Sequence, residues 1–211
     1  PFGTFALAGY GLGARLEYLQ IPLVFGFGAA LVTMVGTNIG AGHTARARRV
    51  AWVGAGLAAA VTGSIGLCGA VFPHLWLGLF STQPEVLTVG TTYLQLVGPT
   101  YGCFGLGLAL YFASQGAGRL LWPLVAGVVR LVVAAGGGWV ASRWWGGGLV
   151  SVFTAMAVAY VIHAAIVAGA IRAGAWHEAA RRPVARHERD TESKEGEHVH
   201  TVRPGAADLS G

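Results

Sequence analysis

The sequence predicts an all-α membrane protein: a polytopic bundle of five transmembrane helices followed by a polar tail. Three observations support this prediction. The 211 residues are 54% hydrophobic and 11% charged, whereas soluble domains carry about 25% charged residues. Residues 1–172 contain two acids and eight arginines, while residues 173–211 hold the other seven acids. Finally, five apolar runs are long enough to cross a bilayer core, which takes about 20 residues per helix.

The five apolar runs follow one another with short polar turns between them. They cover residues 5–35, 50–72, 86–112, 120–141 and 149–171. Pro22 is expected to bend the first span, and the segment after Pro73 is expected to be a loop with an interfacial Trp and Phe. A β-barrel is excluded because its strands would alternate polar and apolar residues. The 34 glycines fit membrane helices, where small residues allow close backbone approach.

The stretch MVGTNIGAGHTARARR (residues 34–49) lies between the first two runs and has two possible interpretations. GAGHTA matches a loose dinucleotide-binding pattern, but such a site needs a short strand before the turn and an acid about 20 residues later. A long apolar run precedes the stretch instead, and no acid occurs between Glu17 and Glu85. We therefore interpret it as an elbow between two membrane helices, in which Gly36 and Gly40 end the first helix and Thr44 caps the second. The elbow residues are Gly36, Asn38, Gly40, Gly42 and Arg46.

The arginines predict how the bundle is oriented in the membrane. Most of those that flank the spans fall on one side, at Arg46, Arg48, Arg49, Arg119 and Arg172. The other side carries Arg15 and Arg143, with Trp144 and Trp145 at the depth of an aromatic belt. Because cytoplasmic turns are enriched in Lys and Arg, we expect a protein of the cell membrane with its N-terminal end outside and its C-terminal end in the cytoplasm.

Residues 6–52 resemble the multidrug and toxic compound extrusion (MATE) transporters, which belong to the multidrug/oligosaccharidyl-lipid/polysaccharide flippase superfamily. The resemblance lies in the entry Ala8 to Arg15, in Pro22, in the elbow VGTNIGAG (35–42), and in Arg46-Ala47. The later segment YFASQGAGRLLWPLVAGVVRL (111–131) is similar to the loop and Pro-containing helix start near the end of these transporters. The likeness covers about residues 6–172.

The resemblance implies a secondary transporter of twelve helices in two lobes, which exports cationic or amphipathic organic compounds in exchange for Na⁺ or H⁺. The five spans would be helices eight to twelve, so residues 1–172 would form most of the C-terminal lobe and the N-terminal lobe would be missing from this chain. Residues 173–211 are expected to be a disordered cytoplasmic tail. A lipid-linked oligosaccharide flippase and a non-transporting five-span accessory subunit remain alternatives.

Ionisable groups inside the spans are the first functional candidates, because a charge in the bilayer core is costly. Glu17 is a candidate cation- or proton-coupling site, and an interfacial or Arg-paired carboxylate is the alternative. Arg130, near the middle of the fourth span, is a candidate cavity or inter-helix charge. The candidates for lining a substrate cavity, with interhelical hydrogen bonding as the alternative role, are Tyr18, Gln20, Gln95 and Tyr101.

We expect no catalytic site, metal site or bound cofactor. The spans show no nucleophile–base arrangement, and Cys68 and Cys103 are expected to be buried free thiols. His198 and His200 lie in the polar tail and do not predict a specific metal site. A basic stripe with interleaved aromatics is absent from the sequence, which excludes a nucleic-acid partner. The expected partners are membrane lipid, small organic substrates and the N-terminal lobe.

Overall fold

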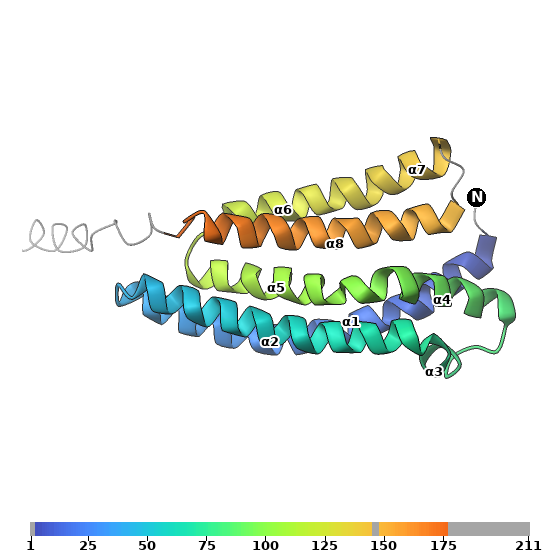
Figure 1. Cartoon of the computed structure of the whole chain (residues 1–211), viewed down its shortest axis with the longest axis horizontal. Helices are drawn as coiled ribbons and strands as arrows, with labels where there is room; N and C mark the ends of the chain where they lie inside the picture. The colour runs from blue at the N-terminus through green and yellow to red at the C-terminus, as the bar shows by residue number, and fades with distance from the viewer. Residues whose placement is uncertain (1–2, 145–147, 177–211) are drawn as a thin grey trace, which may run out of the picture.

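The computed structural model describes residues 3–144 and 148–176. The described chain is all-helical, and five of its helices or helix series are long and apolar enough to cross a membrane. They lie side by side along the long axis of the molecule (Figure 1). This confirms the predicted all-α bundle of five spans. Most of the predicted tail, including His198 and His200, lies outside the described residues, as do the side chains of Arg143, Trp144 and Trp145.

The first two spans are single helices. The first is α1 (Gly3–Gly40), which runs through Pro22 as one helix, and the second is α2 (Thr44–Val71). Part of the loop predicted after the second span is instead the short helix α3 (Pro73–Leu77). Proline at its first position suits a helix start, because that N–H has no intrahelical partner. The indole Nε1 of Trp76 in α3 donates to the carbonyl of Leu12 in α1 at 3.1 Å and fastens α3 to the bundle.

The third and fourth spans contain irregular turns, whereas the fifth is a single helix. The third joins α4 (Pro84–Val97) to α5 (Tyr101–Gly116) through the 3₁₀ turn η1 (Gly98–Thr100). The fourth consists of α6 (Leu121–Leu131), the π-helical segment η2 (Val132–Gly137) and α7 (Gly138–Trp144). The fifth span is α8 (Gly148–Arg172). Pro99 accounts for the turn in the third span, because a proline has no N–H to donate within a helix.

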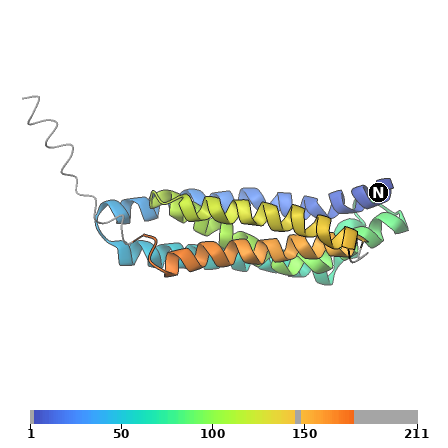
Figure 2. The same cartoon turned by 90° about the horizontal axis from the view of Figure 1, so that it is seen from above.

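The third span is the centre of the bundle. Half of its most apolar stretch is buried, against 11% for the fourth span. Helix α5 packs against α1, α2 and α8, whereas α6 and α7 pack mainly against α8, and the long helices are seen nearly parallel from a second direction in Figure 2. Glycines allow the closest approaches: a Cβ atom on Gly36 of α1 would lie 3.3 Å from the carbonyl oxygen of Gly116 of α5.

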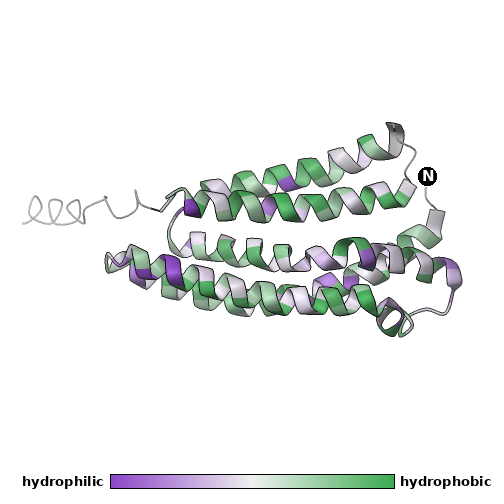
Figure 3. Cartoon of the chain, viewed as in Figure 1, coloured by the Kyte–Doolittle hydropathy of each residue, from purple (hydrophilic) through white to green (hydrophobic). Residues whose placement is uncertain are grey.

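Large apolar side chains cover the outside of the bundle. Hydrophobic residues extend along the whole length of the spans (Figure 3), and Leu7 and Leu79 each expose more than 70% of their surface. A soluble protein rarely exposes apolar surface on this scale, so the outer faces fit a lipid environment. Cys68 and Cys103 are free thiols as predicted, but the prediction that both are buried is wrong, because Cys68 is exposed on this surface.

The elbow between α1 and α2 ends α1 with a Schellman motif. The N–H of His43 donates to the carbonyl of Asn38 at 2.8 Å, and the N–H of Gly42 donates to that of Ile39 at 3.0 Å. This motif needs a left-handed residue, and that residue is Gly42, with φ of +75°. The helix ends at Gly40 as predicted, but Gly36 lies inside it. The predicted Thr44 cap is also wrong, because His43 is the N-cap and its side chain makes no capping hydrogen bond.

Candidate functional site

The carboxylate of Glu17 is held by two tyrosines from other spans. Its Oε2 accepts a hydrogen bond of 2.9 Å from the hydroxyl of Tyr93 in α4. Its Oε1 accepts a second, short hydrogen bond from the hydroxyl of Tyr160 in α8. Hydrogen bonds to a charged acceptor are stronger than those between neutral groups. Glu17 therefore joins the first, third and fifth spans through one side chain.

Two further side chains extend this group. The hydroxyl of Tyr101, at the start of α5, lies 3.5 Å from that of Tyr93. The guanidinium carbon of Arg130, in α6, lies 5.8 Å from the centre of the Tyr160 ring, within the range of a cation–π contact. We call Glu17, Tyr93, Tyr101, Tyr160 and Arg130 the carboxylate–tyrosine cluster. It draws on four of the five spans, so any movement between them must change it.

Close backbone contacts hold the tyrosines in place. Gly13 lies one turn before Glu17 in α1, where a Cβ atom would collide with the ring of Tyr93. Gly66 of α2 faces the start of α5, and a Cβ atom there would overlap the carbonyl oxygen of Gly98 and lie 2.8 Å from the Cβ atom of Tyr101. The absence of a side chain at Gly13 lets α4 bring Tyr93 toward α1, and its absence at Gly66 lets the start of α5 lie close against α2.

Aromatic rings surround the cluster. Tyr93 makes edge contacts with Tyr10, at 5.4 Å between ring centres, and with Phe153, at 5.2 Å. Phe104 packs against Tyr160 at 5.4 Å. Tyr93, Tyr101, Phe153 and Tyr160 are all buried, while Glu17 is partly exposed. The carboxylate therefore lies at the boundary between an apolar aromatic core and the outside of the lobe.

The carboxylate of Glu17 keeps lone pairs that the two tyrosines do not use. A carboxylate offers about four lone-pair positions, and the two phenol hydroxyls occupy one on each oxygen. A proton or a monovalent metal ion could occupy another and neutralise the charge. Within the described chain, Glu17 and Arg130 form no ion pair, and no group of three or more His, Cys, Asp or Glu side chains could hold a metal ion.

The structure brings together some of the predicted residues and separates others. Glu17, Tyr101 and Arg130 lie in the cluster. Gln20 is fully buried, and its Nε2 donates to the carbonyl of Leu16 at 3.2 Å. Tyr18 and Gln95 are exposed. In the elbow, the Nδ2 of Asn38 donates to the carbonyl of Met34, and Gly40 and Arg46 are exposed.

Sequence reasoning missed Tyr93 and Tyr160, which make the two direct hydrogen bonds. Both lie in continuous apolar runs, where a tyrosine looks like an ordinary core residue. The signal that could have found them is chemical, because a buried tyrosine hydroxyl usually needs a hydrogen-bond partner. Glu17 is one of only two acids in residues 1–172, so it was the obvious acceptor inside the membrane.

Comparison with known proteins decides the family. The MatE family profile matches residues 1–140 of the 211. The chain belongs to the MatE family. A Bacillus subtilis relative named "Probable multidrug resistance protein YoeA" is 29% identical over 131 residues, which is 62% of this chain. A Shewanella oneidensis relative named "FAD transporter" is 27% identical over 128 residues, or 61% of the chain.

The family is one of membrane transporters and not of enzymes, which agrees with the five membrane spans and with the predicted resemblance. The matched stretch of this MatE chain covers 28% of the length of each of the two relatives.

Proposed function

We propose that this MatE chain forms part of a cation-coupled exporter of organic compounds, and that Glu17 is its coupling site. The observation that carries the proposal is the pair of tyrosine hydroxyls on the Glu17 carboxylate, because it connects one ionisable group to three spans. Ionisable groups inside membrane spans commonly mark ion pathways or proton relays.

The coupling follows from the chemistry of the carboxylate. When Glu17 is charged, it holds Tyr93 of α4 and Tyr160 of α8 against α1. Binding of H⁺ or Na⁺ neutralises the charge and weakens both hydrogen bonds, since charge-assisted bonds are roughly twice as strong as neutral ones. The helices then lose part of their connection. Ion binding would in this way bias the rocking of this lobe against a second lobe, as in transporters built from repeated halves.

The names of the two relatives include multidrug resistance and FAD transport, so organic molecules are the cargo that the two names share. The partly exposed ring of Tyr10 beside the cluster suits the aromatic rings of such molecules, and a cationic group would also be attracted to Glu17. We accordingly propose planar or amphipathic organic compounds as substrates.

Efflux from cells that lack other drug pumps tests the proposal. The full-length transporter containing Glu17→Gln should lose at least tenfold of its ethidium efflux, whether the driving gradient is H⁺ or Na⁺. Glu85→Gln is the matched control, because Glu85 is an exposed acid in the first turn of α4, outside the cluster. Unchanged, gradient-driven efflux in Glu17→Gln would contradict Glu17 as the coupling site. FAD added as a competitor would report whether the substrate range includes dinucleotides.

A further inference from the structure

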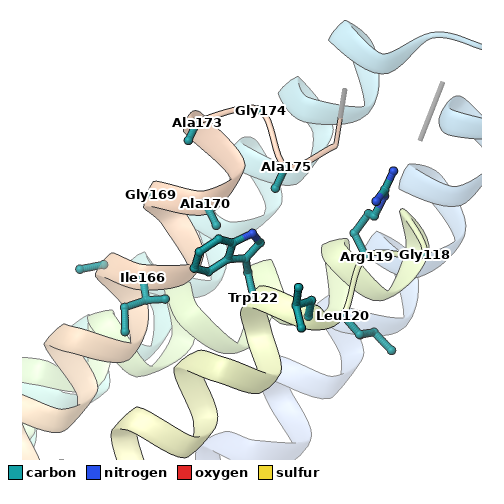
Figure 4. Close-up of a pocket in the computed structure, with 12 residues that line it drawn as sticks. Gly118, Arg119, Leu120, Trp122, Ile166, Gly169, Ala170, Ala173, Gly174 and Ala175 are labelled. Carbon is teal, nitrogen blue, oxygen red and sulfur yellow. The ribbon is translucent and has the colours of Figure 1, made fainter. Parts of the chain in front are cut away.

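A large pocket lies at the elbow end of the bundle, away from the carboxylate–tyrosine cluster. Its volume is about 840 Å³, and it opens between the α5–α6 turn and the last turns of α8. The walls are mainly apolar: Leu121 and Trp122 come from α6, and Ile166, Gly169 and Ala170 come from α8. Figure 4 shows the indole of Trp122 reaching from α6 toward Gly169 and Ala170.

Small residues give the pocket its width. Along α8 its wall is formed at Gly169, where a Cβ atom would meet nothing within 4 Å, and by Ala165 and Ala170, and Ala173 continues the wall just after the helix. On the opposite side, a Schellman motif ends α5: the N–H of Arg119 donates to the carbonyl of Ser114 at 2.9 Å, and Gly118 has φ of +67°. This turn separates the start of α6 from α8 and leaves an apolar groove between the two helices.

A positive charge stands at the edge of this groove. Arg119 lines the pocket, and no acid is among its lining residues in the described chain. In Figure 4 the side chain of Arg119 points away from the apolar walls formed by Trp122 and Ile166. The nearby Arg172 is placed differently, with its guanidinium carbon 4.8 Å from the ring centre of Trp52 in α2.

We propose that this pocket binds an anionic phospholipid of the surrounding leaflet. The charges match, since a guanidinium fork binds a phosphate group through two parallel hydrogen bonds. The apolar groove between Trp122 and α8 would hold part of an acyl chain, and tryptophan favours the interface where headgroup and chain meet. The elbow end also carries Arg46, Arg48 and Arg49, and anionic lipid gathers near such clusters. The lipid would hold α6 to α8 where small residues leave a gap, independently of ion coupling.

Native mass spectrometry of the full-length protein in detergent micelles tests the site. The probes are phosphatidylglycerol, which is anionic, and phosphatidylcholine, which has no net charge. The wild-type protein should retain phosphatidylglycerol at least fivefold more often than phosphatidylcholine, and Arg119→Gln should remove that preference. Gly169→Leu fills the groove and should reduce retention of both lipids. Arg46→Gln is the matched control, because it removes one exposed charge at the same end outside the pocket.

Two results would overturn the proposal. One is equal retention of the two lipids by the wild-type protein, which would exclude headgroup recognition. The other is an equal loss of preference in Arg119→Gln and Arg46→Gln, which would show that diffuse charge at this end attracts the lipid without a site. Far-UV circular dichroism and size-exclusion chromatography confirm that each variant is folded before it is compared, and Trp122→Ala provides a second wall variant if Gly169→Leu fails to fold.

Discussion

Tyr160 and Glu17 show how one hydrogen bond can combine a structural and a functional role. A carboxylate placed inside a membrane bundle without partners would be costly, and the phenol hydroxyls of Tyr93 and Tyr160 supply those partners. The same hydroxyls leave room for a cation on each carboxylate oxygen. In the coupling that we propose, the residue that stabilises the bundle is also the residue on which the ion acts.

Replacing Tyr160 by Phe should destabilise the bundle because it removes a donor from the Glu17 carboxylate. We expect a loss of roughly 1–2 kcal/mol in the free energy of unfolding, the range for interhelical and charged hydrogen bonds. The loss should nearly vanish when Tyr160→Phe is made in a Glu17→Leu background, because the shared bond is then already absent. Unfolding in mixed micelles by increasing SDS measures these differences.

Tyr18→Phe is the control for this cycle. Tyr18 is next to Glu17 in the sequence but exposes 62% of its surface, so its hydroxyl should contribute little. Tyr160→Phe could instead lower the free energy of unfolding by the same amount with and without the Glu17 carboxylate. That result would show that the tyrosine stabilises the bundle through its ring packing alone.

The sequence was informative about which residues are unusual and much less so about which residues meet. Glu17 and Arg130 could be selected because charges are rare in apolar runs. Tyr93 could not, because its role depends on the approach of α4 to Gly13 of α1. Gln95 was selected for its polarity, yet it lies two residues from Tyr93 on a different face of α4 and is exposed.

At the scale of the elements, the spans were predictable and their irregular turns were not. The apolar run 149–171 predicted α8 to within one residue at each end, because the length of a membrane helix is set by the bilayer. The π-helical segment Val132–Gly137 follows Arg130 without any distinct sequence signal beyond its small residues. The 3₁₀ turn at Gly98–Thr100 could be expected from Pro99. The position of Tyr101 could not, because it also depends on how closely α2 packs against this turn.

Gly66→Ala should disrupt the contact between α2 and the start of α5. The added Cβ atom would overlap the carbonyl oxygen of Gly98, which belongs to the backbone and cannot rotate away. We expect a loss of about 1–3 kcal/mol in the free energy of unfolding, as for other overpacked sites, together with weaker transport because Tyr101 is displaced. The same SDS titration and the ethidium efflux assay measure the two effects.

Gly56→Ala provides the matched control in the same helix. A Cβ atom at Gly56 would meet nothing within 4 Å, and alanine favours a helix over glycine by up to about 1 kcal/mol. This variant should be as stable as the wild type or more stable. If Gly66→Ala behaved like Gly56→Ala, α2 and α5 would not approach each other as closely as the structure shows.

At the scale of the whole molecule, charge and topology agree. The α1–α2 elbow, the α5–α6 turn and the end of α8 all lie at one end of the bundle (Figure 1), and these segments contain most of the arginines that flank the spans. We propose on this basis that the elbow end faces the cytoplasm.

Single cysteines test this orientation in intact cells. After removal of Cys68 and Cys103, a membrane-impermeant maleimide should label Ser81→Cys, in the loop between α3 and α4, from outside. Ala45→Cys, at the start of α2 near the elbow, should be labelled only after the cells are opened. The reverse pattern would place the elbow end outside and would contradict the orientation derived from the arginines.

The most direct test of the central claim is the affinity of the purified full-length transporter for tetraphenylphosphonium, measured as H⁺ and Na⁺ concentrations are varied separately. If Glu17 couples ion binding to substrate binding, affinity should fall as one of the two ions rises, because ligands that compete or favour opposite states weaken each other reciprocally. That dependence should be lost in Glu17→Gln and kept in Glu85→Gln. A Glu17→Gln protein that binds substrate with the wild-type ion dependence would contradict the account.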